Sequence, residues 1–132
     1  MKFQNLLNKA VKEVVKKDKE VIAVLVFGSF ARGESYRDID ICIVLDKKYA
    51  KLHMSRKKLK YSSLLPSKYD VSIFQQLPLY IRMRVLKDGK VLLSKNEDLL
   101  YNIAFSTIKE FNMYSKIYNT YLEFVENEKR YW

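Results

Sequence analysis

The sequence predicts an α/β (α+β) fold in which a small mixed β-sheet is flanked by helices and followed by a long C-terminal helix. Short apolar runs rich in valine and isoleucine alternate along the chain with amphipathic segments, which is the order expected of strands and helices. Glycine and proline are rare and fall between these segments, where they open or end elements. From Glu97 to Glu128 neither occurs, which favours one long helix or two broken ones.

The first half of the chain contains one helix and two strands by this reasoning. Apolar residues from Phe3 to Val15 recur at helical spacing with lysines between them, which predicts an amphipathic helix. Val21–Phe27 is continuously apolar and rich in β-branched residues, as expected of a buried strand. A polar loop or short helix through Ala31–Tyr36 leads to a second buried strand, Asp38–Leu45.

The second half continues the alternation. Residues 47–65 are rich in lysine and predicted to be helical in part, and Tyr69–Phe74 alternates like a third strand. Pro78 is expected to open a helix that the pair Asp88-Gly89 ends, and Val91–Leu93 is a short apolar strand. We therefore expect a single domain over residues 1–132, with a core of about 1–95 and a C-terminal helical segment of about 97–130.

Composition narrows the class of protein. About half of the 132 residues are apolar, and no apolar run approaches the length of a membrane span. The N-terminus lacks the continuous apolar segment of a signal peptide, so a cytoplasmic location is expected. Cys42 is the single cysteine, which excludes an internal disulfide and a cysteine-based zinc site. The net charge of +10 fits either a solvated surface or attraction for polyanions such as NTP or RNA.

Three aspartates carry the chemical argument. Asp38 and Asp40 stand two residues apart, so they point to the same face of the predicted second strand. Asp70 stands near the start of the third strand, between apolar neighbours. If these strands pair side by side, three carboxylates converge, and their mutual repulsion calls for a compensating cation. Hard oxygen ligands suit Mg²⁺, and this ligand set matches two-metal phosphoryl transfer.

Gly28 and Ser29, at the end of the first strand, supply a complementary feature. Glycine lets the backbone approach a phosphate closely, and a helix start beyond it would offer N–H groups and a positive dipole end. The Ser29 hydroxyl could donate another hydrogen bond. Arg32 lies close enough in sequence to neutralise phosphate charge. We therefore predict Gly28, Ser29 and Arg32 as nucleotide-binding residues.

The run GSFARGESYRDID, from Gly28 to Asp40, resembles the signature of the DNA polymerase β-type nucleotidyltransferase superfamily in its minimal form. A later strand aspartate of the pattern is matched by Asp70, and the resemblance covers about residues 1–100. It implies an NTP substrate, two Mg²⁺ ions held by Asp38, Asp40 and Asp70, and a triphosphate held by Gly28 and Ser29. Asp70 would help to activate the acceptor hydroxyl.

This sequence departs from the minimal pattern in one place. Eight residues, Phe30 to Arg37, separate Gly28-Ser29 from the Asp-x-Asp pair, whereas minimal members commonly have a longer loop with serine before the first aspartate. The shorter loop could change nucleotide selection or lower activity, but it removes none of the three aspartates.

Nucleotidyltransferases of this size resemble the antitoxin half of HEPN/MNT toxin–antitoxin pairs. That resemblance implies transfer of AMP from ATP to a tyrosine of a HEPN-family toxin, and a hetero-oligomer with that toxin. Two other functions remain open on sequence grounds. Nucleotidyl transfer to RNA or to a small molecule is one, although the positive charge is a poor match for cationic antibiotics. Neutralisation of the toxin by binding alone is the other.

The aromatic residues of the C-terminal helix also allow two interpretations. Phe111, Tyr114, Tyr118, Tyr121 and Phe124 recur at helical spacing. They either cover the sheet as an ordinary core face or dock a helical partner.

Overall fold

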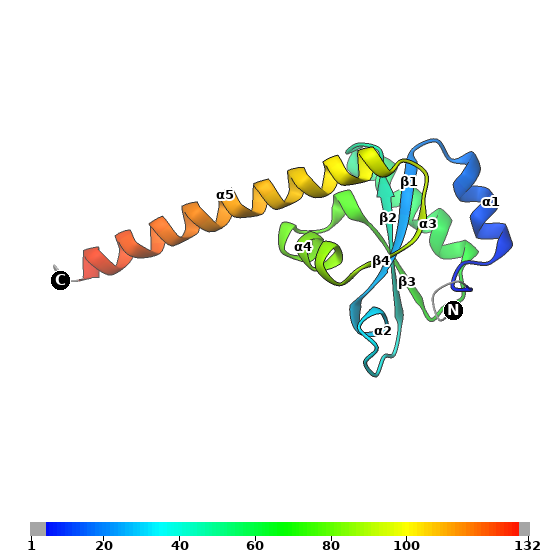
Figure 1. Cartoon of the computed structure of the whole chain (residues 1–132), viewed down its shortest axis with the longest axis horizontal. Coiled ribbons are helices and arrows are strands. Elements are labelled where there is room, and N and C mark those ends of the chain that lie inside the picture. The colour runs from blue at the N-terminus through cyan, green and yellow to red at the C-terminus, as the bar shows by residue number, and fades with distance from the viewer. Residues whose placement is uncertain (1–4, 130–132) are drawn as a thin grey trace.

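The computed structural model describes residues 5–129 as a four-stranded sheet with helices on both faces (Figure 1). The predicted fold class, a mixed sheet flanked by helices with a long C-terminal helix, is confirmed. Within the described residues no helix is long and apolar enough to cross a membrane. The elements in chain order are α1 Lys9–Lys17, β1 Val21–Phe27, α2 Gly28–Ala31, β2 Ile39–Leu45, α3 Lys51–Leu64, β3 Tyr69–Ile73, a 3₁₀ turn Phe74–Gln76, α4 Leu79–Asp88, β4 Lys90–Ser94 and α5 Glu97–Lys129.

The strand order across the sheet is β3-β2-β1-β4. β1 pairs antiparallel with both β2 and β4, whereas β2 and β3 are parallel. The parallel pair requires a crossover, and α3 provides it. This crossover brings the starts of β2 and β3 to the same edge of the sheet, which is where Asp40 and Asp70 lie.

Alternation along the central strands divides the core into two layers. The side of β2 that carries Ile39, Ile41 and Ile43 packs against α1 and α3. The opposite side, which carries Cys42 and Val44, faces α4 and the first part of α5. Asp40 belongs to this second side, because it precedes Cys42 by two residues. The same side that forms the α4–α5 core therefore becomes polar at the start of β2.

Several predicted boundaries are wrong by a residue or more, and two of them affect the core and the acidic site. The first helix starts at Lys9 rather than near Phe3, because the Asn8 side chain accepts a hydrogen bond from the Val11 N–H at 2.9 Å and caps it. Leu6 and Leu7 are buried but precede this cap, and Phe3 lies outside the described residues. The second strand starts at Ile39, so Asp38 stands just before it.

The C-terminal segment is one unbroken helix, α5, and it projects from the body of the molecule (Figure 1). Asn96 caps it by accepting a hydrogen bond from the Leu99 N–H at 3.1 Å. Its first turns pack on the second core layer through Leu99, Leu100 and Ile103. Among its side chains described up to residue 128, Thr107 is the last that is buried. The interpretation that the aromatic residues of this helix cover the sheet is therefore wrong for Tyr114, Tyr118, Tyr121 and Phe124, which are exposed.

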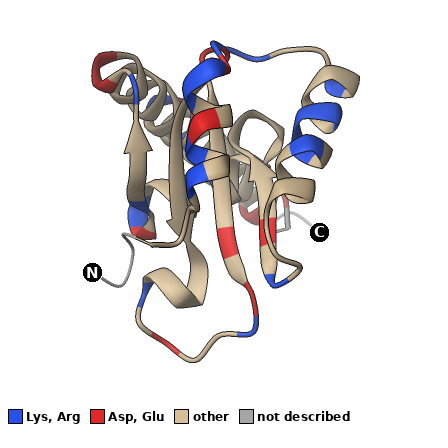
Figure 2. Ribbon diagram, turned by 90° about the vertical axis from the view of Figure 1, so that its right-hand side faces the viewer, with Lys and Arg blue, Asp and Glu red and all other residues tan. Residues whose placement is uncertain are grey.

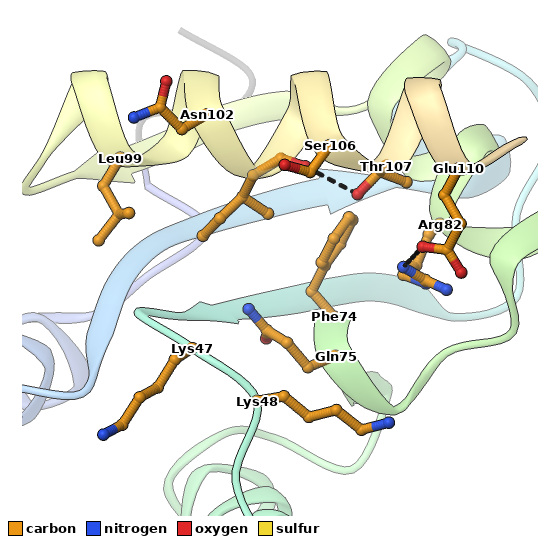
Figure 3. A pocket seen from close by; sticks show the side chains of 11 residues that line it. Lys47, Lys48, Phe74, Gln75, Arg82, Leu99, Asn102, Ser106, Thr107 and Glu110 are labelled. Carbon is orange, nitrogen blue, oxygen red and sulfur yellow. Dashed lines mark hydrogen bonds and ion pairs between the residues drawn. The ribbon is translucent and has the colours of Figure 1, made fainter. Parts of the chain in front are cut away.

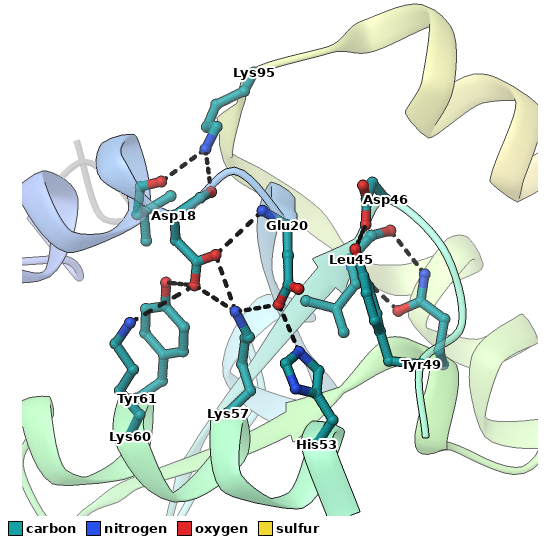
Figure 4. Close-up of polar contacts among 12 residues, drawn as sticks. Asp18, Glu20, Leu45, Asp46, Tyr49, His53, Lys57, Lys60, Tyr61 and Lys95 are labelled. Carbon is teal, nitrogen blue, oxygen red and sulfur yellow. Dashed lines mark hydrogen bonds and ion pairs between the residues drawn. The ribbon is translucent and has the colours of Figure 1, made fainter. Parts of the chain in front are cut away.

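A polar cluster joins the end of α1 and the start of β1 to α3 (Figure 4). The Asp18 carboxylate, whose side chain is 6% exposed, accepts hydrogen bonds from Lys57 at 2.8 Å and from Tyr61 at 2.8 Å. Lys57 also pairs with Glu20 at 2.6 Å. Burial opposes ionisation of Asp18, but the hydrogen bonds from Lys57 and Tyr61 outweigh it and lower its pKa. This cluster therefore stabilises the ionised carboxylate.

We expect Asp18→Asn to lower the free energy of unfolding at pH 7 by about 2 kcal/mol, the scale of charge-assisted hydrogen bonds. Because the folded-state pKa of Asp18 is lowered, its contribution is complete above the unfolded pKa of about 3.9 and is lost as pH falls through the folded value. The difference between wild type and variant in urea unfolding should be constant from pH 7 to 5 and shrink below about pH 4. A difference that grows on acidification would contradict this role.

Candidate nucleotidyl-transfer site

The acidic site forms where β2 and β3 begin. The parallel register sets Asp40 directly opposite Asp70, and Figure 2 shows acidic positions side by side on the two strands. Asp38 precedes Asp40 by two residues and lies just outside β2. Asp38 and Asp70 are exposed, whereas Asp40 is partly buried. The pairing on which the sequence prediction of a three-aspartate site depended is thus present.

The pKa of Asp40 is affected by the other two carboxylates. Burial is the largest cause that raises its pKa, followed by the negative charges of Asp70 and then Asp38. Arg32 partly opposes this shift. A carboxylate whose pKa is raised by burial and by two like charges is strongly stabilised in its ionised form by an added cation, since the cation offsets these causes.

Gly28 lies against this carboxylate. Its φ of +75° falls in the left-handed region, and a Cβ atom built on it would collide with Asp40 Oδ2. Both facts require glycine. Helix α2 begins at Gly28 itself, so the N–H groups of its first turn, which have no partner inside a helix, stand beside the acidic site.

A pocket of about 290 Å³ adjoins Asp40. It brings three predicted nucleotide-binding residues, Gly28, Ser29 and Arg32, together with the central aspartate. Asp38 and Asp70 do not line it. Its lining residues are Phe27, Gly28, Ser29, Arg32, Asp40, Ile81, Arg84 and Asp88.

The family model described as "Polymerase beta, Nucleotidyltransferase" matches residues 9–98. The chain belongs to this family. The match covers α1 to the first turn of α5 and therefore includes every element that contributes to the acidic site and its pocket.

Comparison with individual proteins agrees with this family. The chain is 37% identical over 82 residues to a candidate protein adenylyltransferase of Methanocaldococcus jannaschii, and the match spans 61% of the chain and 62% of that relative. A chain in the crystal structure of a toxin–antitoxin complex with AMP-PNP has a TM-score of 0.65 at 21% identity, over 90% of this chain and 98% of that one. A chain of the tri-AMPylated Shewanella oneidensis HEPN toxin in complex with MNT antitoxin gives 0.65 at 20% identity, over 95% and 98%. These structural likenesses establish the fold.

Within this nucleotidyltransferase, α4 supplies pocket residues that the sequence analysis missed. Ile81, Arg84 and Asp88 line the pocket from one face of α4, at the spacing of successive helical turns. Asp88 pairs with Arg32 at 3.4 Å, and Arg32 also pairs with Glu34 at 3.2 Å. The helical spacing was visible in the sequence, but nothing there indicated that this face of α4 lies over α2.

The donor set of the nucleotidyltransferase suits a hard cation. Three carboxylates at neighbouring strand ends are the oxygen ligands that Mg²⁺ prefers, and the raised pKa of Asp40 shows that the charges of Asp70 and Asp38 reach it. Among residues 5–129, however, no three acidic, histidine or cysteine side chains are already gathered closely enough to hold a metal ion. The residues fit the metal by their chemistry and by the register that aligns Asp40 with Asp70.

Proposed function

We propose that the chain is a Mg²⁺-dependent protein adenylyltransferase that transfers AMP from ATP to a tyrosine of a HEPN-family toxin and thereby acts as its antitoxin. The observation that carries this proposal is the register of Asp40 with Asp70 beside the Gly28–Ser29 pocket. The named functions of the similar proteins point to the same acceptor class.

Each site residue has a distinct task under this proposal. Asp38 and Asp40 would hold the metal ions with Asp70, and the bound ions supply charge neutralisation of the triphosphate and activation of the attacking oxygen. The backbone of Gly28 and the Ser29 hydroxyl hold the triphosphate, and Arg32 neutralises part of its charge.

Asp70 is the exposed member of the aligned pair, so it can reach an acceptor that approaches from solvent. It accepts the proton of the tyrosine hydroxyl as the oxygen attacks the α-phosphorus. The bond from that phosphorus to the bridging oxygen then breaks, and pyrophosphate leaves. A new phosphodiester joins AMP to the tyrosine.

When a nucleotide binds, Arg32 exchanges one ion-pair partner for another. Its guanidinium pairs with Glu34 and Asp88, and the hydrogen bond to Glu34, followed by the weaker effect of Asp88, raises its pKa although burial opposes the shift. A triphosphate oxygen would replace one of these carboxylates. Until the nucleotide binds, the Asp88 carboxylate thus occupies a position at the Arg32 guanidinium that a triphosphate oxygen would take.

The direct test combines the protein with ATP labelled at the α-phosphate, Mg²⁺ and the HEPN protein encoded by the neighbouring gene. We expect label on a tyrosine of that protein, loss of its ribonuclease activity, and no label when EDTA removes the metal. Absence of label, or absence of such a neighbouring gene, would contradict the proposal.

A double variant, Asp38→Asn with Asp40→Asn, separates catalysis from occlusion. We expect it to bind the toxin and leave it active. If this variant neutralises the toxin fully, the chain is an antitoxin that acts by binding alone. Extension of an RNA 3′ end without any protein partner would instead assign the site to RNA.

A further inference from the structure

An apolar groove runs between α4 and α5 on the side away from the sheet. One part of about 600 Å³ contains Met83, Leu86 and Ile108, and an adjoining part of about 440 Å³ contains Leu79 and Tyr114. Tyr80 and Phe111 line both parts, so the two form one continuous depression. We call it the α4–α5 groove.

The groove borders the nucleotidyl-transfer site. Arg84 lines both the groove and the pocket beside Asp40. Its guanidinium donates to the Tyr80 hydroxyl at 3.0 Å and lies 5.0 Å from the centre of that ring. A molecule that fills the groove therefore contacts a residue of the catalytic pocket.

The two helices that form the groove are also joined by an ion pair that lies outside it. Arg82 of α4 pairs with Glu110 of α5 at 3.4 Å, next to the seat of Thr107 (Figure 3). Val85, which is fully buried, anchors α4 in the core beneath. The buried contacts of α4 and of the first turns of α5 therefore hold in place the two helices that form the groove.

The apolar face of α5 continues beyond the groove. Thr107, Tyr114, Tyr118, Tyr121 and Val125 follow one another at three-, four- and seven-residue steps, so they share the helix face that packs on the sheet in the first half. Thr107 is 3% exposed, whereas Tyr114 is 58% and Tyr121 60% exposed. The helix face that is buried in the core at Thr107 is therefore exposed to solvent from Tyr114 onward.

The size of this exposed face indicates what covers it. Met113, Tyr114, Ile117, Tyr118, Tyr121, Leu122 and Phe124 are each about half to two-thirds exposed. At roughly 200 Å² for a large side chain, they offer on the order of 800 Å², which is the area that one partner contributes to a stable interface. Lys116 is the one charged residue from Phe111 to Leu122, so the covering surface is apolar.

The width of the face indicates the shape of the partner. At 100° per residue, Met113 and Leu122 lie about 180° apart around α5, which is wider than the contact stripe of a single packed helix. Two helices placed side by side would cover it. One copy of α5 from a second molecule would leave about half of the face exposed.

We propose that the acceptor protein docks a pair of its own apolar helices on the α4–α5 groove and on the exposed apolar face of α5 between Met113 and Phe124. This docking places the acceptor hydroxyl beside Arg84, at the mouth of the catalytic pocket. This inference rests on the proposed function, because it names the surface by which that acceptor is held. Its basis is the continuity of groove and pocket at Arg84.

The test uses two charge-matched double variants of the full chain. Ile117→Glu with Tyr121→Glu changes the apolar face, and Asn112→Glu with Asn119→Glu changes the opposite face of the same helix; all four residues are exposed. Binding of the neighbouring HEPN protein is measured by calorimetry, and AMP transfer by label from ATP. ATP affinity is measured separately, and the size of each variant alone by light scattering.

We expect the first variant to weaken partner binding by at least about tenfold and to lose AMP transfer, with ATP affinity unchanged. The second variant should behave like wild type. Partner binding that survives in the first variant would overturn the proposal, as would failure of the wild type to bind. A wild-type dimer that the first variant makes monomeric would assign the surface to self-association.

Failure of the proposed function has a different signature. If the wild-type chain binds the HEPN protein without transferring AMP, and the first variant loses that binding, the docking surface stands and the adenylyltransferase activity does not.

Discussion

Replacing Asp40 with asparagine should lower the initial rate of nucleotidyl transfer by at least about 10²–10³-fold, the scale on which a single transition-state-stabilising group acts. Asp40 is the partly buried member of the acidic set and lies opposite Asp70, so the remaining exposed carboxylates cannot replace its charge. The rate of AMP transfer at saturating ATP and Mg²⁺ measures this effect.

The same substitution should leave thermal stability unchanged or higher. The pKa of Asp40 is raised in the folded state, so its ionised form costs stability at every pH above the folded-state value. Asparagine removes this cost. A variant that loses activity because it unfolds would show a lower midpoint of thermal unfolding, which is the result that would contradict a direct catalytic role.

Asp46→Asn is a matched control, since Asp46 follows the other end of β2. Its Oδ1 atom accepts a hydrogen bond from the Tyr49 hydroxyl at 2.7 Å, which the asparagine amide oxygen can still accept. The same loss of one negative charge there should change the transfer rate less than about twofold. An equal loss at both positions would point to net charge rather than to the acidic site.

Gly28→Ala should destabilise the protein and also lower transfer by on the order of 10²-fold. The new Cβ atom would collide with Asp40 Oδ2, so either the carboxylate or the start of α2 must move. The positive φ adds about 1 kcal/mol of backbone strain. Urea unfolding and the rate of AMP transfer measure the two effects separately.

Gly33→Ala is a control that introduces the same backbone strain without a steric collision. Gly33 has a nearly identical φ of +77°, but a Cβ atom there would meet nothing within 4 Å. It should lose about 1 kcal/mol of stability and retain transfer within about threefold of wild type. If both alanine variants lose activity equally, contact of Gly28 with Asp40 is not what requires glycine at the site.

Local sequence signals were sufficient for the first two strands, but they were misjudged at the first helix. The apolar run of β1 and the alternation at the start of β2 placed both strands within a residue of their observed bounds. The first helix boundary was missed because the Asn8 cap outweighed the apolar spacing that begins at Phe3. The cap was readable in the sequence, since asparagine before a lysine-rich helix is a common start signal.

The candidate site was predictable in part for the same reason. Asp38 and Asp40 are related by alternation along one segment, and Gly28 and Ser29 by their place at a strand end. Arg84 and Asp88 belong to the pocket only because α4 crosses over α2. Helical spacing shows that they share a face with Ile81, but not what that face covers.

The sequence by itself determined the elements, the aspartate pair and the glycine, since each depends on residues a few positions apart. Only the tertiary structure decided that Asp70 meets Asp40, that α4 closes the pocket and that half of α5 extends from the body (Figure 1). Each of these depends on the pairing or packing of segments far apart in the chain. Apolar residues recur at the same spacing on a helix face that is buried on its own sheet and on one that binds a partner. Only the fold, which shows where the sheet ends, could distinguish these two interpretations of α5.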